Sequence, residues 1–150
     1  TMPTLPPVDA CERFRDKYPS AVELQRRYDN RWGLGDPLGS NSKRALIGGW
    51  IRFDEPHATD ALAVAAYTDA FVPAVFTRVP AQSAVGPVPT IDLTIHFRAS
   101  LPLEGSVVGE HCIAVFTSRT SREGFMEEDG EIWSAGGVLL AESRQLALVG

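Results

Sequence analysis

One aspartate lies where the sequence predicts a buried helix face. Asp69 follows Ala65 by four residues and Leu62 by seven, so the three share one side of a helix predicted over residues 57–78. A carboxylate buried there without a partner would be costly, or would take up a proton. Two interpretations follow. Asp69 reaches water or a loop amide near the helix end, or it is a carboxylate held in a cleft as a general base.

Two further polar side chains, Gln145 and Thr90, lie on predicted strands. In the segment LLAESRQLALV, alternation places Gln145 on a face of small and apolar residues, where a buried amide must find a partner. Thr90 opens the segment TIDLTIHFRA. By pattern alone, Gln145 is a structural amide that satisfies a neighbouring strand, and Thr90 is an ordinary threonine at the start of a strand. Functional roles for both remain the alternative.

Other arrangements for catalysis are not evident in the sequence. It contains no G-x-S-x-G motif. Cys112 adjoins His111 in a predicted strand, so the two side chains would point to opposite faces and form no catalytic pair. The cysteines and histidines have no zinc-site spacing; they are Cys11, Cys112, His57, His96 and His111. We therefore expect no metal and no cofactor, and both cysteines as reduced thiols.

The elements that must position these side chains are one helix and several strands. Strict alternation over Thr90–Ala99 predicts a strand with an apolar buried face and with Thr90 on its polar face. The alanine-rich segment HATDALAVAAYTDAFVPAVFTR predicts a long helix buried on most sides, with Thr59 as its N-cap. Asp60 suits the positive end of the helix dipole, and Pro73 should bend or end the helix.

The remaining segments predict strands. A weak pattern favours one at Glu23–Trp32, and others are expected at 44–54, 106–118, 125–134 and 137–149. The pair Gly48-Gly49 indicates a bulge or the close approach of another backbone. The turn sequence EEDGE around Gly130 either precedes or interrupts its strand, and a bulge there is an equal alternative. Two strands, a helix and three or four further strands predict an α+β fold, an antiparallel sheet packed on one long helix.

Length and composition set broad limits. The 150 residues suit one domain with its own core, and 44% hydrophobic and 22% charged residues are ordinary for a globular protein. A net charge of −5 and scattered basic residues do not favour nucleic-acid binding. No apolar run approaches a membrane span and no signal peptide is visible, so we expect neither a membrane partner nor secretion, and place the protein in the cytoplasm.

Three segments, taken in order, resemble a known family. AAYTDAFVPAVF, PTIDLTIHFR and EIWSAGGVLLAESRQLALV are similar to the C-terminal half of the type II, TesB-like, acyl-CoA thioesterases, over roughly Gly48 to Val149. The resemblance implies a hotdog fold, in which an antiparallel sheet wraps a central helix. It also implies that Asp69, Thr90 and Gln145 together bind a catalytic water, and that the substrate is an acyl-CoA.

The resemblance also bears on domain organisation and partners. Family members carry two hotdogs joined by a linker, with the site between them, and the proline-rich residues 1–20 look like that linker. Residues 21–150 would then be one hotdog domain, the C-terminal half of a double-hotdog protein. Its expected partner is a second hotdog half or another copy of the chain.

Two other functions stay open. The second hypothesis is a non-catalytic hotdog module that binds acyl chains or serves only in assembly. A hotdog hydratase acting on enoyl-CoA is the third reading, but that chemistry wants a histidine a few residues after the aspartate, and none follows Asp69 closely. Arg98, Arg119 and Arg122 are candidates to grip the phosphates of CoA.

Overall fold

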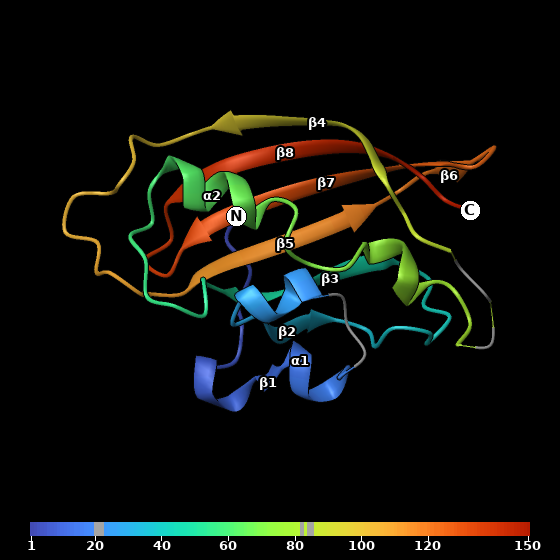
Figure 1. Ribbon diagram of the computed structural model, residues 1–150, viewed down its shortest axis with the longest axis horizontal. Coiled ribbons are helices and arrows are strands. Elements are labelled where there is room, and N and C mark those ends of the chain that lie inside the picture. Colours follow the sequence, from blue (N-terminus) through green and yellow to red (C-terminus); the bar gives the residue numbers. More distant parts are fainter. Residues whose placement is uncertain (20–22, 82, 84–85) are drawn as a thin grey trace.

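The computed structural model describes residues 1–19, 23–81, 83 and 86–150. Its described strands form one sheet in the order β1-β2-β3-β5-β7-β8-β4, with the short β6 paired to β7 (Figure 1). All neighbouring strands are antiparallel, which confirms the predicted type of sheet. The strands are β1 Glu12–Arg13, β2 Arg31–Gly35, β3 Ala45–Ile51, β4 Thr90–Phe97, β5 Cys112–Ser118, β6 Ser121–Arg122, β7 Phe125–Ser134 and β8 Leu139–Leu148.

The helix on this sheet is much shorter than the sequence predicts. The helix α2 spans Ala61–Tyr67, and a separate 3-10 turn, η3, spans Ala74–Thr77. The N-cap is Asp60 and not Thr59: the Asp60 carboxylate accepts the Ala63 N–H at 2.8 Å. The prediction of one long central helix is therefore corrected to a short helix followed by an irregular segment.

One local and one distant hydrogen bond explain why the helix ends early. The Thr68 hydroxyl donates to the Ala65 carbonyl at 2.7 Å and competes with continued helical bonding. Farther along, the Asn30 amide donates to the Ala70 carbonyl at 2.8 Å. The Asn30 amide thus satisfies a carbonyl that a longer helix would have satisfied internally, and local sequence does not reveal this distant partner.

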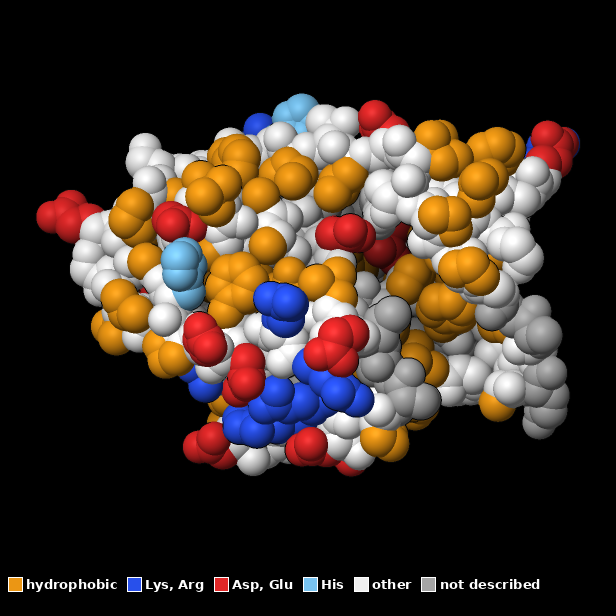
Figure 2. All heavy atoms as spheres, viewed as in Figure 1, with side chains coloured by type: hydrophobic (Ala, Val, Ile, Leu, Met, Phe, Trp, Pro, Cys, Tyr) orange, Lys and Arg blue, Asp and Glu red, His pale blue; other side chains and the backbone are white. Residues whose placement is uncertain are grey.

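The face of α2 that packs on the sheet is not the one predicted. Ala63, Val64 and Tyr67 are buried, and the Tyr67 hydroxyl accepts the backbone N–H of Phe53. Leu62 on the opposite side is 80% exposed. Figure 2, viewed with α2 in front of the sheet, shows apolar side chains gathered on this outward surface. The predicted burial of α2 on most sides is therefore wrong for the isolated chain.

Helical turns precede the larger strands. They are η1 Val8–Ala10, α1 Phe14–Lys17 and η2 Glu23–Arg27. The predicted strand over Glu23–Trp32 is thus wrong in its first half, and β2 begins only at Arg31. The physical reason is that Asp29 and Asn30, between η2 and β2, turn inward and are buried with polar partners.

Asp29 is the centre of a buried ion cluster. Its carboxylate contacts Arg31 at 3.2 Å, Arg13 at 3.3 Å, Arg52 at 3.6 Å and His111 at 3.1 Å. Burial opposes the charge, but the hydrogen bonds from Arg31 and His111 hold the pKa of Asp29 below its ordinary value. The cluster joins β1, β2, the residue after β3 and the residue before β5.

Two glycine sites behave differently from each other. A Cβ on Gly49 would lie 1.8 Å from the Arg31 carbonyl oxygen, which confirms the predicted close backbone approach. The turn predicted around Gly130, in contrast, is wrong. β7 continues through Gly130 in regular register, with Gly130 opposite Phe116 of β5 and Ser143 of β8. A Cβ there would meet the Phe116 ring at 2.8 Å, so packing explains the glycine.

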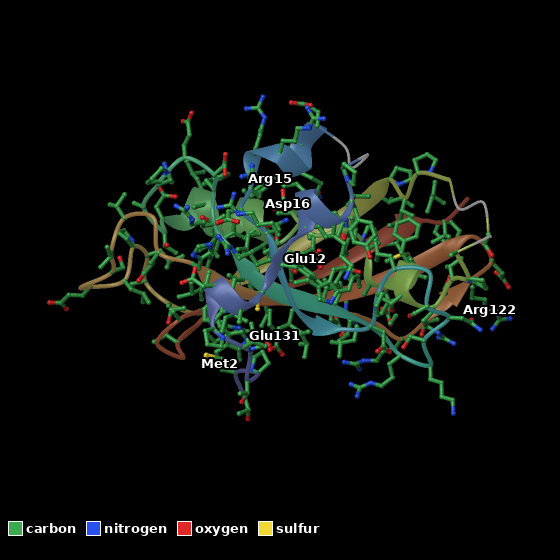
Figure 3. All side chains as sticks on the ribbon, turned by 90° about the horizontal axis from the view of Figure 1, so that it is seen from below. Met2, Glu12, Arg15, Asp16, Arg122 and Glu131 are labelled. Atoms are coloured by element: carbon green, nitrogen blue, oxygen red, sulfur yellow. The ribbon has the colours of Figure 1, made fainter. Side chains whose placement is uncertain are left out.

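Part of the segment 1–20, which the sequence suggested to be a linker, packs against the domain. β1 pairs with β2, and the buried Phe14 ring stacks on Trp32 with centroids 6.1 Å apart. Nearer the N-terminus, Met2 lies beside Gly137, and Figure 3 shows Met2 with Glu131 on the side of the sheet away from α2. The domain boundary at residue 20 stays a prediction, and residues 20–22 lie outside the described part.

Candidate active site

A bulge at the start of β4 brings Thr90 to the face where α2 lies. Thr90 pairs with Ala147 and Asp92 pairs with Leu146, so Ile91 is an extra residue between them. Leu93 then pairs with Gln145, which places Thr90 on the same face as Leu93 and Gln145. The strict alternation predicted for this strand is therefore wrong at its first residues, and the same bulge leaves Ile91 52% exposed.

The structure brings together the three residues singled out in the sequence. The Gln145 amide nitrogen donates to Asp69 Oδ1 at 3.1 Å and also to Thr90 Oγ1. Gln145 is 8% exposed, as its predicted position among small and apolar residues implies. The trio joins three parts of the chain: the end of α2, the start of β4 and the C-terminal half of β8.

The hydrogen-bonding capacity of the trio leaves groups free for a ligand. An ionised carboxylate only accepts, so the NH₂ end of Gln145 must face Asp69, and its two hydrogens are used by Asp69 and Thr90. The Thr90 hydroxyl accepts from Gln145 and keeps its own hydrogen to donate. The second Asp69 oxygen is not used by Gln145. A water between Asp69 and Thr90 can donate to the carboxylate and accept from the hydroxyl.

The electrostatics favour a base of raised strength at Asp69. The residue is exposed in the single chain, yet protein atoms pack around its carboxyl group. Burial raises the pKa of Asp69 above its ordinary value, and the Gln145 hydrogen bond opposes this only in part. The residue therefore combines access from the open side with a proton affinity above that of a fully solvated carboxylate.

The structure also reveals a carboxyl group that sequence reasoning missed. Glu128 on β7 pairs directly with Gln145 on β8, and it is 5% exposed. Burial raises its pKa to about 7, although the N–H of Ala74 opposes that shift. In the segment EGFMEEDGE, the turn expected at Gly130 meant that the strand alternation was not continued through Glu128. A continuous strand would have placed Glu128 on the inner face with Met126.

The surroundings of the trio are apolar. A small cluster of Val75, Met126 and Ala147 is buried beside it, with Val88 and Val149 packed against its edge. Figure 2 shows a hollow in this face, with acidic side chains at its margin and in its depth. The site thus consists of a few polar side chains in an apolar surface, as is usual for small-molecule sites.

The three arginines proposed for CoA binding do not lie with the trio. Arg98 pairs with Glu142, and Arg119 pairs with Asp129, on the face of the sheet opposite Gln145. Arg122 pairs with its neighbour Glu123 and lies at the far end of the molecule in Figure 3. Arg119 and Arg122 do line one hollow with Val75 of the small cluster, whereas Arg98 lies apart from them.

A separate hollow of about 600 Å³ adjoins the start of α2. Its lining has mixed charge and apolar walls, from Arg26, Arg27, Phe53, Asp54, Glu55, Pro56, His57, Leu62 and Ala63.

Among the described residues, no three His, Cys, Asp or Glu side chains come together as metal ligands. Within the same residues, no helix has the length and hydrophobicity required to cross a membrane. Cys11 and Cys112 are buried and free.

Comparisons with known structures establish the fold. A hot dog fold protein of unknown function from Alicyclobacillus acidocaldarius superposes with a TM-score of 0.87 at 27% identity, over 100% of this chain and 55% of that one. A protein assigned as a thioesterase II from Thermobifida fusca gives 0.71 at 25% identity, with 99% and 53% covered. The acyl-CoA thioesterase II TesB2 of Mycobacterium marinum gives 0.67 at 20% identity, with 99% and 55% covered.

The chain spans about half the length of each of these structures. Among curated proteins, none is similar enough to count as a match. The hotdog fold implied by the sequence is confirmed by the likeness to the Alicyclobacillus protein. Residues 4–149 match the family described as the acyl-CoA thioesterase C-terminal domain, which covers nearly the whole chain. The chain belongs to the family of acyl-CoA thioesterase C-terminal domains.

Proposed function

We propose that this domain carries the catalytic residues of a thioesterase that hydrolyses fatty acyl-CoA to a free fatty acid and CoA. The observation that carries the proposal is the Gln145 amide bonded to both Asp69 and Thr90 on an otherwise apolar face. Membership of the thioesterase family supports thioester hydrolysis in general. The acyl substrate and the roles of individual residues are our inference.

The proposed reaction uses an activated water and no covalent intermediate. Asp69 accepts a proton from the water while the water oxygen forms a bond with the thioester carbonyl carbon. Thr90 and Gln145 have no useful pKa for this step, and they orient the water and the carboxylate. Collapse of the tetrahedral intermediate breaks the C–S bond, and the proton held by Asp69 passes to the departing CoA sulfur.

The open side of α2 supports a two-unit site. Leu62 projects from α2 into solvent at 80% exposure, and Asp69, two residues after the end of α2, is also exposed. Contact with a second hotdog unit would cover this apolar surface and withdraw the Asp69 water from bulk solvent. We infer that the acyl group lies along this covered surface, and that the unit comes from the same polypeptide or from another copy.

Release of free thiol tests the proposal. Acyl-CoAs of several chain lengths should yield CoA with the wild-type protein and far less with Asp69→Asn. The assay should be run with the chain alone and with a second hotdog unit added, because the single chain leaves Asp69 open. Absorbance of an enoyl-CoA, followed in parallel, reports hydration. Binding of acyl-CoA without thiol release in either form would favour the non-catalytic module.

Single turnover in ¹⁸O-labelled water tests the route. Direct attack by water places the label in the fatty acid and leaves the protein unlabelled. Attack by the Asp69 carboxylate itself would form an anhydride, and its hydrolysis at the Asp69 carbonyl would place the label in Asp69. Mass spectrometry of the peptide that contains Asp69 separates the two outcomes, and label there would overturn the general-base role.

A further inference from the structure

Glu128 is a buried carboxyl group that the proposed reaction does not use. It lies on β7 directly opposite Gln145 on β8, so the two side chains are cross-strand neighbours on one face. It is 5% exposed. Among the described residues, the charged groups that act on it are Asp69 and Glu127, both acidic. A carboxyl group with no cationic partner in such a place requires another physical explanation.

The explanation is one strong hydrogen bond to the backbone. Glu128 Oε2 accepts the N–H of Ala74 at 2.6 Å. Ala74 is the first residue of η3, follows Pro73, and is itself 0% exposed. An N–H at this position has no partner within its own turn, and leaving it unsatisfied in the interior costs about 1–3 kcal/mol. The Glu128 carboxyl supplies the missing acceptor from 54 residues away.

This bond fixes one end of the segment that carries Asp69. Between α2 and η3 the chain runs without helix or strand from Thr68 to Pro73. Asn30 holds the segment near its start, through the Ala70 carbonyl at 2.8 Å, and Glu128 holds its far end at Ala74. Glu128 and Gln145 are cross-strand neighbours. The bond from Ala74 to Glu128 and the bond from Gln145 to Asp69 therefore attach the segment to the same part of the sheet.

We propose that Glu128 is a positioning residue of this site: its carboxyl oxygen holds the Ala74 N–H and thereby fixes Asp69 against the Gln145 amide. Without this acceptor, the Ala74 N–H seeks water and the segment moves away from the sheet. A displacement on the order of 1 Å is enough to impair a proton transfer. Only the kinetic consequence of the proposal rests on the proposed function, because the geometry is independent of catalysis.

Nuclear magnetic resonance on the intact chain tests the geometry without any activity. The Gln145 side-chain amide donates to Asp69, so its proton signals should follow the ionisation of that carboxyl group as pH changes. Glu128→Gln keeps an oxygen that can accept the Ala74 N–H and should preserve this response. Glu128→Met is close in size but offers no acceptor, and should abolish it. A preserved response in Glu128→Met would overturn the proposal.

A matched control separates positioning from general stability. Thr77 is 0% exposed and donates to the Ala74 and Arg44 carbonyls, so Thr77→Val weakens the same turn without touching the Ala74 N–H. It should leave the Gln145 signals responsive to Asp69. If Thr77→Val abolishes the response as Glu128→Met does, Glu128 is only one of several groups that stabilise η3, and the proposal fails.

The wild-type protein provides a further test should Glu128→Met not fold. The Ala74 amide should exchange slowly with solvent, and its proton signal should shift as Glu128 ionises. Fast exchange with no such shift would overturn the proposal.

Kinetics form the second arm of the experiment, in whichever form hydrolyses acyl-CoA. Glu128→Met should lower kcat by about tenfold or more and change KM by less than about twofold, while Glu128→Gln keeps most of the turnover. Unchanged kcat in Glu128→Met would overturn the positioning role. If the NMR results hold and no form hydrolyses acyl-CoA, the proposed function fails and the positioning of Asp69 by Glu128 stands.

Discussion

The buried Glu128 carboxyl should make the protein less stable as pH rises through neutrality. Burial raises its folded-state pKa to about 7 from an ordinary value of 4.5. Between these values the folded protein keeps the proton while the unfolded chain releases it, so the free energy of unfolding falls with increasing pH. At ~1.4 kcal/mol per pH unit, this loss amounts to about 3 kcal/mol and is complete above the folded-state pKa.

Glu128→Gln removes the ionisation and keeps an acceptor for the Ala74 N–H. The variant should therefore lack this loss. Its stability should exceed that of the wild type increasingly from pH 5 to pH 8, by up to about 2.5 kcal/mol relative to the difference at pH 5. Urea unfolding, followed by tryptophan fluorescence at a constant chain concentration, measures the free energy at each pH.

Glu104→Gln is the matched control, because it makes the same chemical change at an exposed loop position. Its curve of stability against pH should run parallel to that of the wild type. Parallel curves for Glu128→Gln as well would refute the reasoning. Glu128 would then ionise in the folded protein as readily as in the unfolded chain, and the site would be far more hydrated than its 5% exposure implies.

Four further outcomes are expected. Asp69→Asn should lower turnover about 10²–10⁴-fold with little change in stability, and turnover equal to wild type would exclude Asp69 as the general base. In the wild type, kcat/KM should fall at acid pH with an apparent pKa above the ordinary aspartate value, because burial raises the pKa of Asp69. Gln145→Ala should lower kcat more than it raises KM, with a milder effect for Thr90→Val, whereas an effect on KM alone would reassign the amide to substrate binding. Asp29→Asn should lower the free energy of unfolding by about 3 kcal/mol, because it removes the buried carboxylate and leaves the partly buried Arg31 and Arg52 without their shared partner. The exposed pair of Asp54 provides the comparison, and Asp54→Asn should lower the free energy of unfolding by less than about 1 kcal/mol. Light scattering should show a dimer of the chain, since α2 leaves an apolar surface open, and a well-folded monomer at micromolar concentration would contradict this.

The sequence singled out the members of the candidate site but not how the chain brings them together. Asp69 was conspicuous as a carboxylate on an apolar helix face, and Gln145 as an amide on an inner strand face. Both signals are local, because they depend on periods of 3.6 and 2 residues. The roles assigned to the trio came from resemblance to a family, since by pattern alone Thr90 was an ordinary strand residue.

Local pattern failed where distant partners decide the backbone. The helix ends after Tyr67, and its continuation is replaced by bonds from Asn30 and Glu128, which lie far away in the sequence. The buried and open faces of α2 were exchanged for a similar reason. Both faces are apolar, so hydrophobicity alone could not choose between them, and the bond from the Phe53 backbone to Tyr67 helps to fix the choice.

The sequence by itself determined the kind of sheet, the strand β8 and the inward position of Gln145, because alternation over a long strand leaves only one face to bury. Only the tertiary structure decided that Thr90 meets Gln145. A single extra residue at Ile91 reverses the alternation at the head of β4, and such a bulge is set by pairing with β8 and not by the residues of β4 alone. The same holds for Glu128, whose place beside the site follows from the register of two strands.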